Sequence, residues 1–181
     1  MMIFPSLILY MYFYWNNQDP PVYDIISPIT TLLLIPTLKN NMLISCLLLE
    51  SIADYYMNKS NLRFPIFLFS LSHIIKQIIY LQMNVISLTS LNISLLSLLL
   101  IILSNDVIDL YGIILACTFI TISYAKKSLD VGMLLFIISD IIIGLDLKIR
   151  LYPRQLRVIL VPLLYWISQN VFIKSLKGFY N

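Results

Sequence analysis

The chain has 181 residues, of which 60% are apolar and only 12% are charged, and its formal net charge is +3. Soluble domains carry about 25% charged residues, so this composition excludes an ordinary soluble domain, a disordered chain and a coiled coil. The basic residues are scattered rather than gathered in a stripe, so no nucleic-acid partner is expected. Cys46 and Cys117 both lie in apolar runs and give no indication of an oxidising compartment. We therefore expect an integral membrane protein.

The charged residues divide the chain into apolar runs close to the roughly 20 residues that a helix needs to cross a membrane. The first run, over residues 4–17, has no charge and ends in tyrosines and Trp15, which is typical of an interfacial belt. We interpret this run as a retained first span rather than a signal peptide, because it lacks a basic region before the apolar stretch. Pro20 and Pro21 then indicate a turn before the second run, over residues 23–38.

The stretch from Phe64 to Ser104 is apolar over about twice the length of a single span, so it must turn back once. The polar residues around Gln82 and Asn84 are the expected turn. Charged clusters separate the remaining runs. The sequence predicts an all-α, polytopic membrane bundle of eight transmembrane helices, over residues 4–17, 23–38, 42–57, 64–82, 86–104, 108–125, 131–147 and 157–174.

These spans form a single transmembrane domain over residues 1–181. The basic residues divide almost evenly between the two faces of such a bundle, so they do not set its orientation. We expect a multi-pass protein of the endoplasmic reticulum or another endomembrane in a eukaryote, or of the plasma membrane in a bacterium. The oligomeric state is left open.

Ionisable side chains inside the predicted spans are few, namely Glu50, Asp54, His73, Lys76 and Asp140. Each costs about 2.5–3.5 kcal/mol at the centre of a membrane helix, so each needs a structural or functional reason. The two aspartates favour a functional reason on this cost alone.

The depths of these groups in the membrane agree with one another. With a rise of 1.5 Å per residue, Asp54 lies about 18 Å into the third predicted helix and Asp140 about 14 Å into the seventh, which runs in the same direction. His73 and Gln169 lie about 14 and 18 Å in from the opposite face, on the fourth and eighth helices. The sequence predicts that these four side chains face one internal cavity.

The other polar groups have simpler interpretations. A single buried His or Gln in a membrane bundle is usually an interhelical hydrogen-bonding group. Lys76 is expected to extend along its helix toward an interface, with an ion pair to Glu50 as the alternative. The single histidine and the absence of a Cys/His cluster exclude the usual zinc site, and the sequence lacks a Gly-x-Ser-x-Gly elbow and a glycine-rich phosphate loop. No metal and no cofactor are expected.

Several short motifs, in order along the chain, resemble the lysoplasmalogenase family of eight-helix membrane proteins. The matching segments are Ser-Pro-Ile-Thr-Thr-Leu-Leu-Leu at 27–34, Ala53-Asp54, the segment that ends in His73, Gly-Met-Leu-Leu-Phe-Ile-Ile-Ser-Asp-Ile at 132–141, and Tyr-Trp-Ile-Ser-Gln at 165–169. The sequence departs from the family pattern at Ser27, Ala53 and Lys76, where the family carries Lys, Gly and Tyr.

The resemblance implies an ether hydrolase that cleaves the vinyl-ether bond of lysoplasmalogens, giving a fatty aldehyde and glycerophospho-ethanolamine or -choline. The substrate is a lysophospholipid within the bilayer. It also implies catalytic roles for Asp54 and Asp140, one as acid and one as anion, with the assignment between them open. The residues that would support them are His73 and Gln169, which orient water or an aspartate, Tyr165, which bonds the glycerol oxygen, and Ser139 and Glu50.

Two other functions remain open. The chain is a non-catalytic membrane subunit or lipid-binding relative if Asp54 and Asp140 act only as interhelical hydrogen-bonding groups. It is an ion or proton carrier if they act as relay groups. Transporters usually have helices broken by Gly or Pro at the midplane, and the predicted spans contain little of either.

Overall fold

The computed structural model describes residues 28–29, 31–32, 34–35, 40–57, 61–80, 85–103, 106–149 and 154–180. Over these residues the chain is all-α, which confirms the predicted fold class at the level of a helical bundle. The predicted helix 4–17 and most of 23–38 lie outside the described residues. Within the second of these, residues 28–29 and 31–32 are helical.

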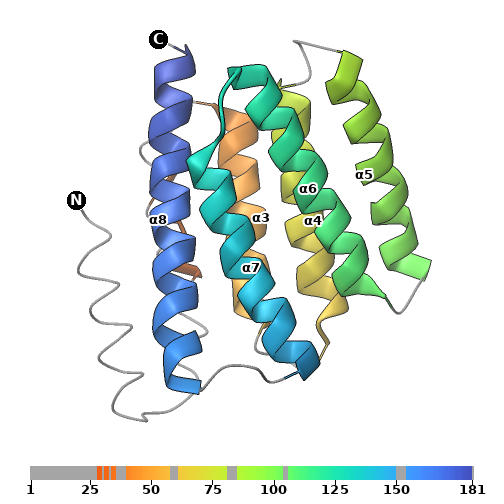
Figure 1. Cartoon of the computed structure of the whole chain (residues 1–181), viewed down its shortest axis with the longest axis vertical. Helices are drawn as coiled ribbons and strands as arrows, with labels where there is room; N and C mark the ends of the chain where they lie inside the picture. The colour runs from red at the N-terminus through yellow and green to blue at the C-terminus, as the bar shows by residue number, and fades with distance from the viewer. Residues whose placement is uncertain are drawn as a thin grey trace.

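The described residues form antiparallel helices in an up-and-down order (Figure 1). They agree with the six predicted helices from 42–57 onward, and the largest difference is at α8, which is longer than the predicted 157–174. Because neighbours in the chain alternate in direction, α3 and α7 run the same way. The helices are α3 (Asn41–Met57), α4 (Arg63–Tyr80), α5 (Val85–Leu103), α6 (Val107–Lys126), α7 (Val131–Ile149) and α8 (Arg154–Tyr180).

Polar residues at the helix ends satisfy backbone groups that have no partner within the helix. Asn40 Oδ1 accepts hydrogen bonds from the backbone N–H groups of the first turn of α3, and Asp130 Oδ1 accepts one from Met133 N at 2.7 Å in α7. Lys127, with φ 52°, ends α6 in the left-handed conformation, and its N–H and that of Ser128 bond carbonyl groups of the last turn. These local signals explain why the helices begin and end where the charged and polar residues stand.

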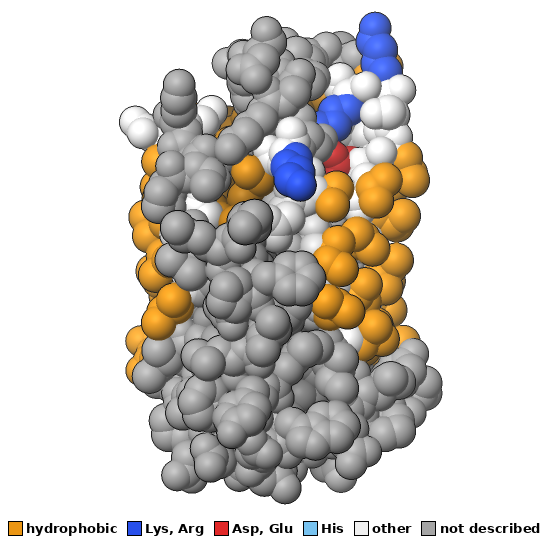
Figure 2. Space-filling view, turned by 90° about the vertical axis from the view of Figure 1, so that its left-hand side faces the viewer, with side chains coloured by type: hydrophobic (Ala, Val, Ile, Leu, Met, Phe, Trp, Pro, Cys, Tyr) orange, Lys and Arg blue, Asp and Glu red, His pale blue; other side chains and the backbone are white. Residues whose placement is uncertain are grey.

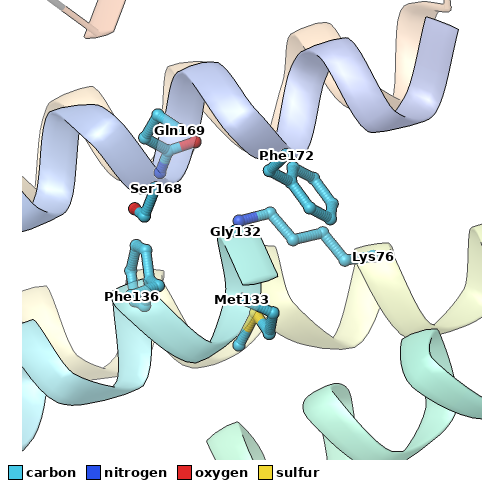
Figure 3. Close-up of a pocket in the computed structure, with 7 residues that line it drawn as sticks. All are labelled: Lys76, Gly132, Met133, Phe136, Ser168, Gln169 and Phe172. Carbon is cyan, nitrogen blue, oxygen red and sulfur yellow. The ribbon is translucent and has the colours of Figure 1, made fainter. Parts of the chain in front are cut away.

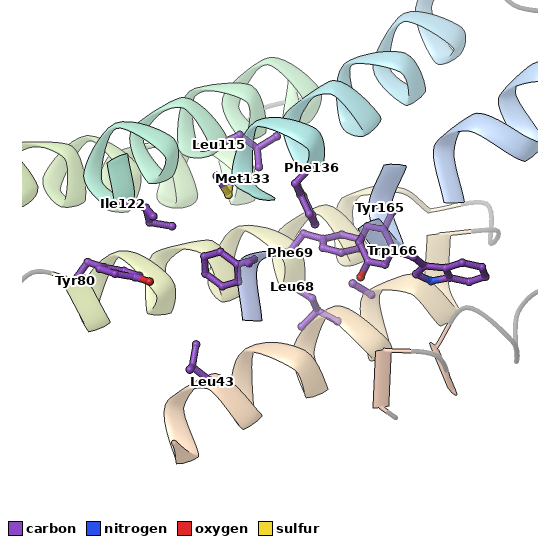
Figure 4. Close-up of a cluster of buried hydrophobic side chains, with 12 residues drawn as sticks. Leu43, Leu68, Phe69, Tyr80, Leu115, Ile122, Met133, Phe136, Tyr165 and Trp166 are labelled. Carbon is purple, nitrogen blue, oxygen red and sulfur yellow. The ribbon is translucent and has the colours of Figure 1, made fainter. Parts of the chain in front are cut away.

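The helices pack as neighbouring pairs, α3 on α4, α5 on α6 and α7 on α8, and α4 also packs on both α5 and α6. The largest core cluster combines side chains of α3, α4, α6, α7 and α8, and it is rich in aromatic rings (Figure 4). A smaller cluster joins α5 to α4 and α6 through Ile66, Ile74, Ile101 and Ile114. The aromatic cluster surrounds the polar residues described below.

The outward faces of the helices are also apolar. On α5, the relative exposure of Leu96 is 58%, of Leu99 55% and of Leu103 74%. Figure 2 shows apolar side chains along the flanks of one face of the molecule, with Lys and Arg gathered toward one end. Among the described helices, α6 is long and apolar enough to cross a membrane by length and composition, and shorter apolar segments lie at Leu88–Leu103 and Val131–Leu145.

Candidate functional site

Glu50, on α3, is the centre of the best-connected polar group in the described part of the bundle. Its side chain is fully buried and accepts hydrogen bonds from Ser72 Oγ at 2.7 Å and Gln169 Nε2 at 2.9 Å. Lys76 Nζ forms an ion pair with the same carboxylate. We call Glu50, Ser72, Lys76 and Gln169 the Glu50 network. It ties α3, α4 and α8 together.

The prediction that Lys76 extends to an interface is wrong. Lys76 instead forms the ion pair with Glu50 that was the alternative. Lys76 is 2% exposed. Its Nζ lies 5.4 Å from the ring centroid of Phe136 and 5.2 Å from that of Phe172. The carboxylate of Glu50 on the neighbouring helix and the faces of two aromatic rings stabilise the buried ammonium group and offset the loss of its hydration. This makes the buried position more favourable than one in which the side chain extends to an interface.

Asp54 lies one turn beyond Glu50 on α3 and joins a different set of hydroxyl groups. Its Oδ2 accepts hydrogen bonds from Thr31 Oγ1 at 3.2 Å and Tyr165 Oη at 3.3 Å. The two hydroxyl groups are 3.4 Å from each other. Thr31 and Tyr165 of α8 therefore both contact α3 at this carboxylate.

Asp140, on α7, accepts a hydrogen bond from Tyr111 Oη of α6 at 2.6 Å. Its neighbour Ser139 has a structural bond, because its Oγ donates to the backbone carbonyl of Val161 on α8 at 3.2 Å. Ser139 thus helps to hold α7 against α8. The Asp140–Tyr111 hydrogen bond joins α7 to α6. The Asp54–Tyr165 hydrogen bond joins α3 to α8 in the same way.

His73 lies between these two carboxylates, within a path of aromatic rings. Its ring centroid is 5.0 Å from that of Phe136 and 6.0 Å from that of Tyr111. Phe136 in turn lies 5.4 Å from Tyr165. The rings of Tyr111, His73, Phe136 and Tyr165 therefore link Asp140 to Asp54.

The imidazole of His73 is fully buried, and among the described residues neither of its nitrogens has a hydrogen-bond partner. A buried polar group without a partner is costly. Among the described residues of this region, His73 therefore has the most buried polar atoms without a hydrogen-bond partner.

A cavity of about 10 Å³ lies beside the Glu50 network, between α4, α7 and α8. Of the four side chains predicted to share a cavity, Gln169 lines this one, whereas Asp54, Asp140 and His73 are not among its lining residues. Figure 3 shows Lys76 Nζ pointing toward α8, where Ser168 and Gln169 lie. The structure gathers the predicted residues around one aromatic region, but it does not place all four on the wall of this cavity.

Sequence reasoning missed three side chains that contact the predicted carboxylates: Thr31, Ser72 and Tyr111. Tyr111 carried no usable signal, because it lies within the first turn or two of the predicted helix 108–125, where a tyrosine is typical of a membrane interface. Ser72 carried none, since serine is common throughout the predicted spans. Thr31 lies in the motif at 27–34 without any assigned role.

The chemistry available here is that of carboxyl groups, tyrosine hydroxyls, one imidazole and one ammonium, all held between helices. Asp54 and Asp140 each accept a tyrosyl hydrogen bond, so both carboxyl groups are held in fixed positions. Proton transfer is the reaction that such groups support. Comparison of the chain with protein-family models, with curated proteins and with solved structures finds no match to any of them.

Proposed function

We propose that this protein is a multi-pass membrane protein whose described helices contact lipid on their outward faces. The support is the inverted distribution of polarity: large apolar side chains are exposed on α5 and on the other described helices, while Glu50, His73 and Lys76 are buried between helices. Ionisable residues within a membrane almost always face the bundle interior in this way. Exposed apolar patches of this extent are rare on soluble monomers.

We further propose that the protein hydrolyses the vinyl-ether bond of a lysoplasmalogen, with Asp54 and Asp140 as the acid–base pair. The observation that supports this proposal is that each aspartate accepts a hydrogen bond from a tyrosine. The rings of these two tyrosines are connected through Phe136 and His73, and neither nitrogen of His73 has a hydrogen-bond partner among the described residues. The resemblance of the motifs around these residues to the lysoplasmalogenase family supplies the substrate class.

The reaction needs two carboxyl groups in different protonation states. The protonated one gives its proton to the β-carbon of the vinyl ether, which creates an oxocarbenium-like cation. The ionised one stabilises that cation and accepts a proton from the attacking water, much as paired carboxyl groups do in glycosidases. The hemiacetal then breaks its carbon–oxygen bond to give the fatty aldehyde and the free glycerol hydroxyl. The hydrocarbon chain of the substrate dissolves in lipid, which accounts for carboxyl groups inside a membrane bundle.

The experiment is to purify the full chain in detergent and measure aldehyde released from a 1-alkenyl lysophospholipid. The matched control is the 1-acyl lysophospholipid with the same headgroup, since its ester bond does not respond to protonation at carbon. Aldehyde release from the alkenyl substrate alone supports the proposal. No aldehyde from folded protein rules it out.

One observation favours the non-catalytic alternative, in which the protein acts as a membrane subunit. The cavity described above has room for about one water molecule, far less than a lipid chain needs, and the ion pair of Lys76 and Glu50 beside it is buried. Under this alternative the aspartates and the Glu50 network only join helices. It predicts no turnover of either the alkenyl or the acyl lysophospholipid.

A further inference from the structure

Helix α5 lies at one edge of the described bundle and has two distinct faces (Figure 1). It packs on α4 and α6. Because an α-helix turns by about 100° per residue, the buried side chains of its inner face fall on one line along the helix. They are Ser90, Ser94, Ser97 and Ile101. The opposite face is exposed.

The side chains along the middle of this exposed face repeat with the spacing of a helix–helix interface. They are Thr89, Asn92, Leu96, Leu99 and Leu103, and all five are exposed. The intervals between them alternate between three and four residues, which is the pattern by which two helices pack along a shared seam. The three leucines are the most exposed apolar side chains described on α5. We call these five residues the α5 seam.

Asn92 is the residue of the α5 seam that contact with lipid does not satisfy. It is exposed, and among the described residues its amide has no hydrogen-bond partner. It stands two residues from Ser94, the midpoint of α5, so in a membrane-spanning helix it lies about 3 Å from the middle of the span. An amide has two donors and an acceptor, and hydrocarbon supplies a partner for none of them. In membrane proteins such side chains form hydrogen bonds between helices.

The α5 seam is complementary to itself. Copies inserted in one membrane share an orientation, so two of them pair about a two-fold axis along the membrane normal. Each residue of the seam then lies at the same depth as its equivalent, and the amide of Asn92 meets the same amide of the second copy. Each amide donates to the carbonyl oxygen of the other. Since α5 carries no charged residue over Val85–Leu103, the two identical faces do not repel each other.

We propose that the α5 seam is the interface for a second copy of this chain, with the Asn92 amides of the two copies hydrogen-bonded to each other. In coiled coils a single Asn in such a seam sets the register and the number of chains. The inference rests on the membrane placement proposed above and is independent of the hydrolysis. Outward faces away from the seam remain in contact with lipid.

Disulfide cross-linking tests the seam directly. Leu96→Cys places a thiol on the seam, and Ile102→Cys places one about 120° away around the same helix. The two parent side chains are almost equally exposed, at 58% and 53%. Vesicles containing each variant are treated with copper–phenanthroline in air, which oxidises pairs of thiols to disulfides, and the covalent dimer is measured by electrophoresis. The unmutated chain is the blank for Cys46 and Cys117, which are buried.

A disulfide needs two Cα atoms within about 7 Å of each other, so random collisions in the membrane form it poorly. We expect Leu96→Cys to give mainly covalent dimer and Ile102→Cys to give mainly monomer. Equal cross-linking at the two positions would indicate random collision and would overturn the inference. A failure of Leu96→Cys to cross-link would overturn it as well.

Asn92→Leu tests the hydrogen bond within the interface. Because Asn92 is exposed, the change leaves the fold of each copy intact. Loss of the paired amides should raise the dissociation constant of the dimer in lipid about tenfold. Asn92→Gln keeps an amide and should retain most of the affinity, and Ile102→Leu, off the seam, should change nothing. Energy transfer between labelled copies measures the constant as vesicles are diluted with lipid. An Asn92→Leu variant that pairs as tightly as the unmutated chain would overturn the inference.

Neither experiment measures aldehyde, so the dimer and the hydrolase are tested separately. Cross-linking through Leu96→Cys in a protein that releases no aldehyde supports the interface and removes the hydrolase. Aldehyde release by a protein that stays monomeric in vesicles overturns the interface and leaves the hydrolase standing. A dimer that is linked only through Ile102→Cys would place the second copy on another face, and it would also overturn the inference.

Discussion

Glu50 shows at the scale of single residues how this bundle accommodates charge. The carboxylate accepts hydrogen bonds from Ser72 and Gln169 and forms an ion pair with Lys76, so both of its oxygens have polar partners. A buried ion pair is weak evidence for stability, because desolvation offsets most of the attraction between the charges. Loss of one partner is a different matter, since it leaves the other charge buried and unpaired.

Lys76→Met should therefore destabilise the protein by about 3–5 kcal/mol, because the buried carboxyl group of Glu50 loses its counter-ion. The double variant Glu50→Gln/Lys76→Met removes both charges and should recover most of that loss. The exposed Lys127→Met is the matched control and should change little. Denaturant unfolding in detergent micelles measures all three. A single variant as stable as the double one would contradict the account of the Glu50 network.

The side-chain contacts of these residues could not be predicted from the sequence. The sequence showed that Glu50 and Asp54 lie one turn apart and that Lys76 stands inside a span, but it could not show which helix faces which. The direction of the Lys76 side chain depends on α3 lying beside α4, which is a tertiary fact. Tyr111 reaches Asp140 for the same reason, through the contact of α6 with α7.

At the scale of helices, most boundaries could be predicted from the sequence. The boundaries of α3 to α7 follow from where charged and polar residues interrupt the apolar runs, because a charge is costly when it is buried among apolar side chains. Caps such as Asn40 and Asp130 then fix the helix ends to within a few residues. The end of α8 was not predicted correctly, because Lys174 and Lys177 mark the limit of the apolar run but leave the helix itself uninterrupted.

The contact between α7 and α8 depends on one glycine. A Cβ atom added at Gly132 would lie 2.7 Å from the backbone nitrogen of Phe172 and 2.9 Å from its Cα. Small residues allow such close backbone approach between membrane helices. Phe172 also lines the cavity and lies over Lys76, so this close approach helps to place the wall of the cavity.

Gly132→Ala should force α7 and α8 apart and cost about 1–3 kcal/mol of stability, as overpacking generally does. Gly112→Ala on α6 is the matched control, since its added Cβ has nothing within 4 Å. That control should stabilise the protein by up to about 1 kcal/mol, because alanine favours a helix more than glycine does. The midpoint of thermal unfolding in detergent compares the two. Equal midpoints would show that the close contact has no energetic weight.

At the scale of the whole molecule, the main property of the described helices is that large apolar side chains are exposed on their outer faces while polar groups lie between them. The outward side chains of α5 are mostly leucines and isoleucines, with Thr89 and Asn92 among them, whereas its buried side chains include Ser90, Ser94 and Ser97. Ser94 and Thr118 both contact Gln77 Nε2, at 2.8 and 2.9 Å, so hydrogen bonds join α4, α5 and α6 from within. In lipid, packing and such hydrogen bonds hold helices together because the outside is as apolar as the core.

Spin labels test this arrangement in a bilayer. A label at Leu95, near the middle of the exposed face of α5, should collide readily with oxygen and hardly with a water-soluble nickel complex if this face contacts lipid. A label at Lys127, in the connection after α6, should show the reverse. Ready access of the nickel complex to Leu95 would be the opposite result and would contradict a membrane-spanning bundle.

The central claim is that Asp54 and Asp140 act as one acid–base pair on a vinyl ether, and aldehyde release from Asp→Asn variants tests it most directly. Asparagine keeps the shape of the side chain but can neither donate an acidic proton nor carry the negative charge. Asp54→Asn and Asp140→Asn should each lower the rate by about 10²–10⁴-fold, and the double variant should be scarcely worse than either, because the groups act as a unit. His73→Gln, at matched expression, should lose less. Full activity in either asparagine variant would contradict the claim.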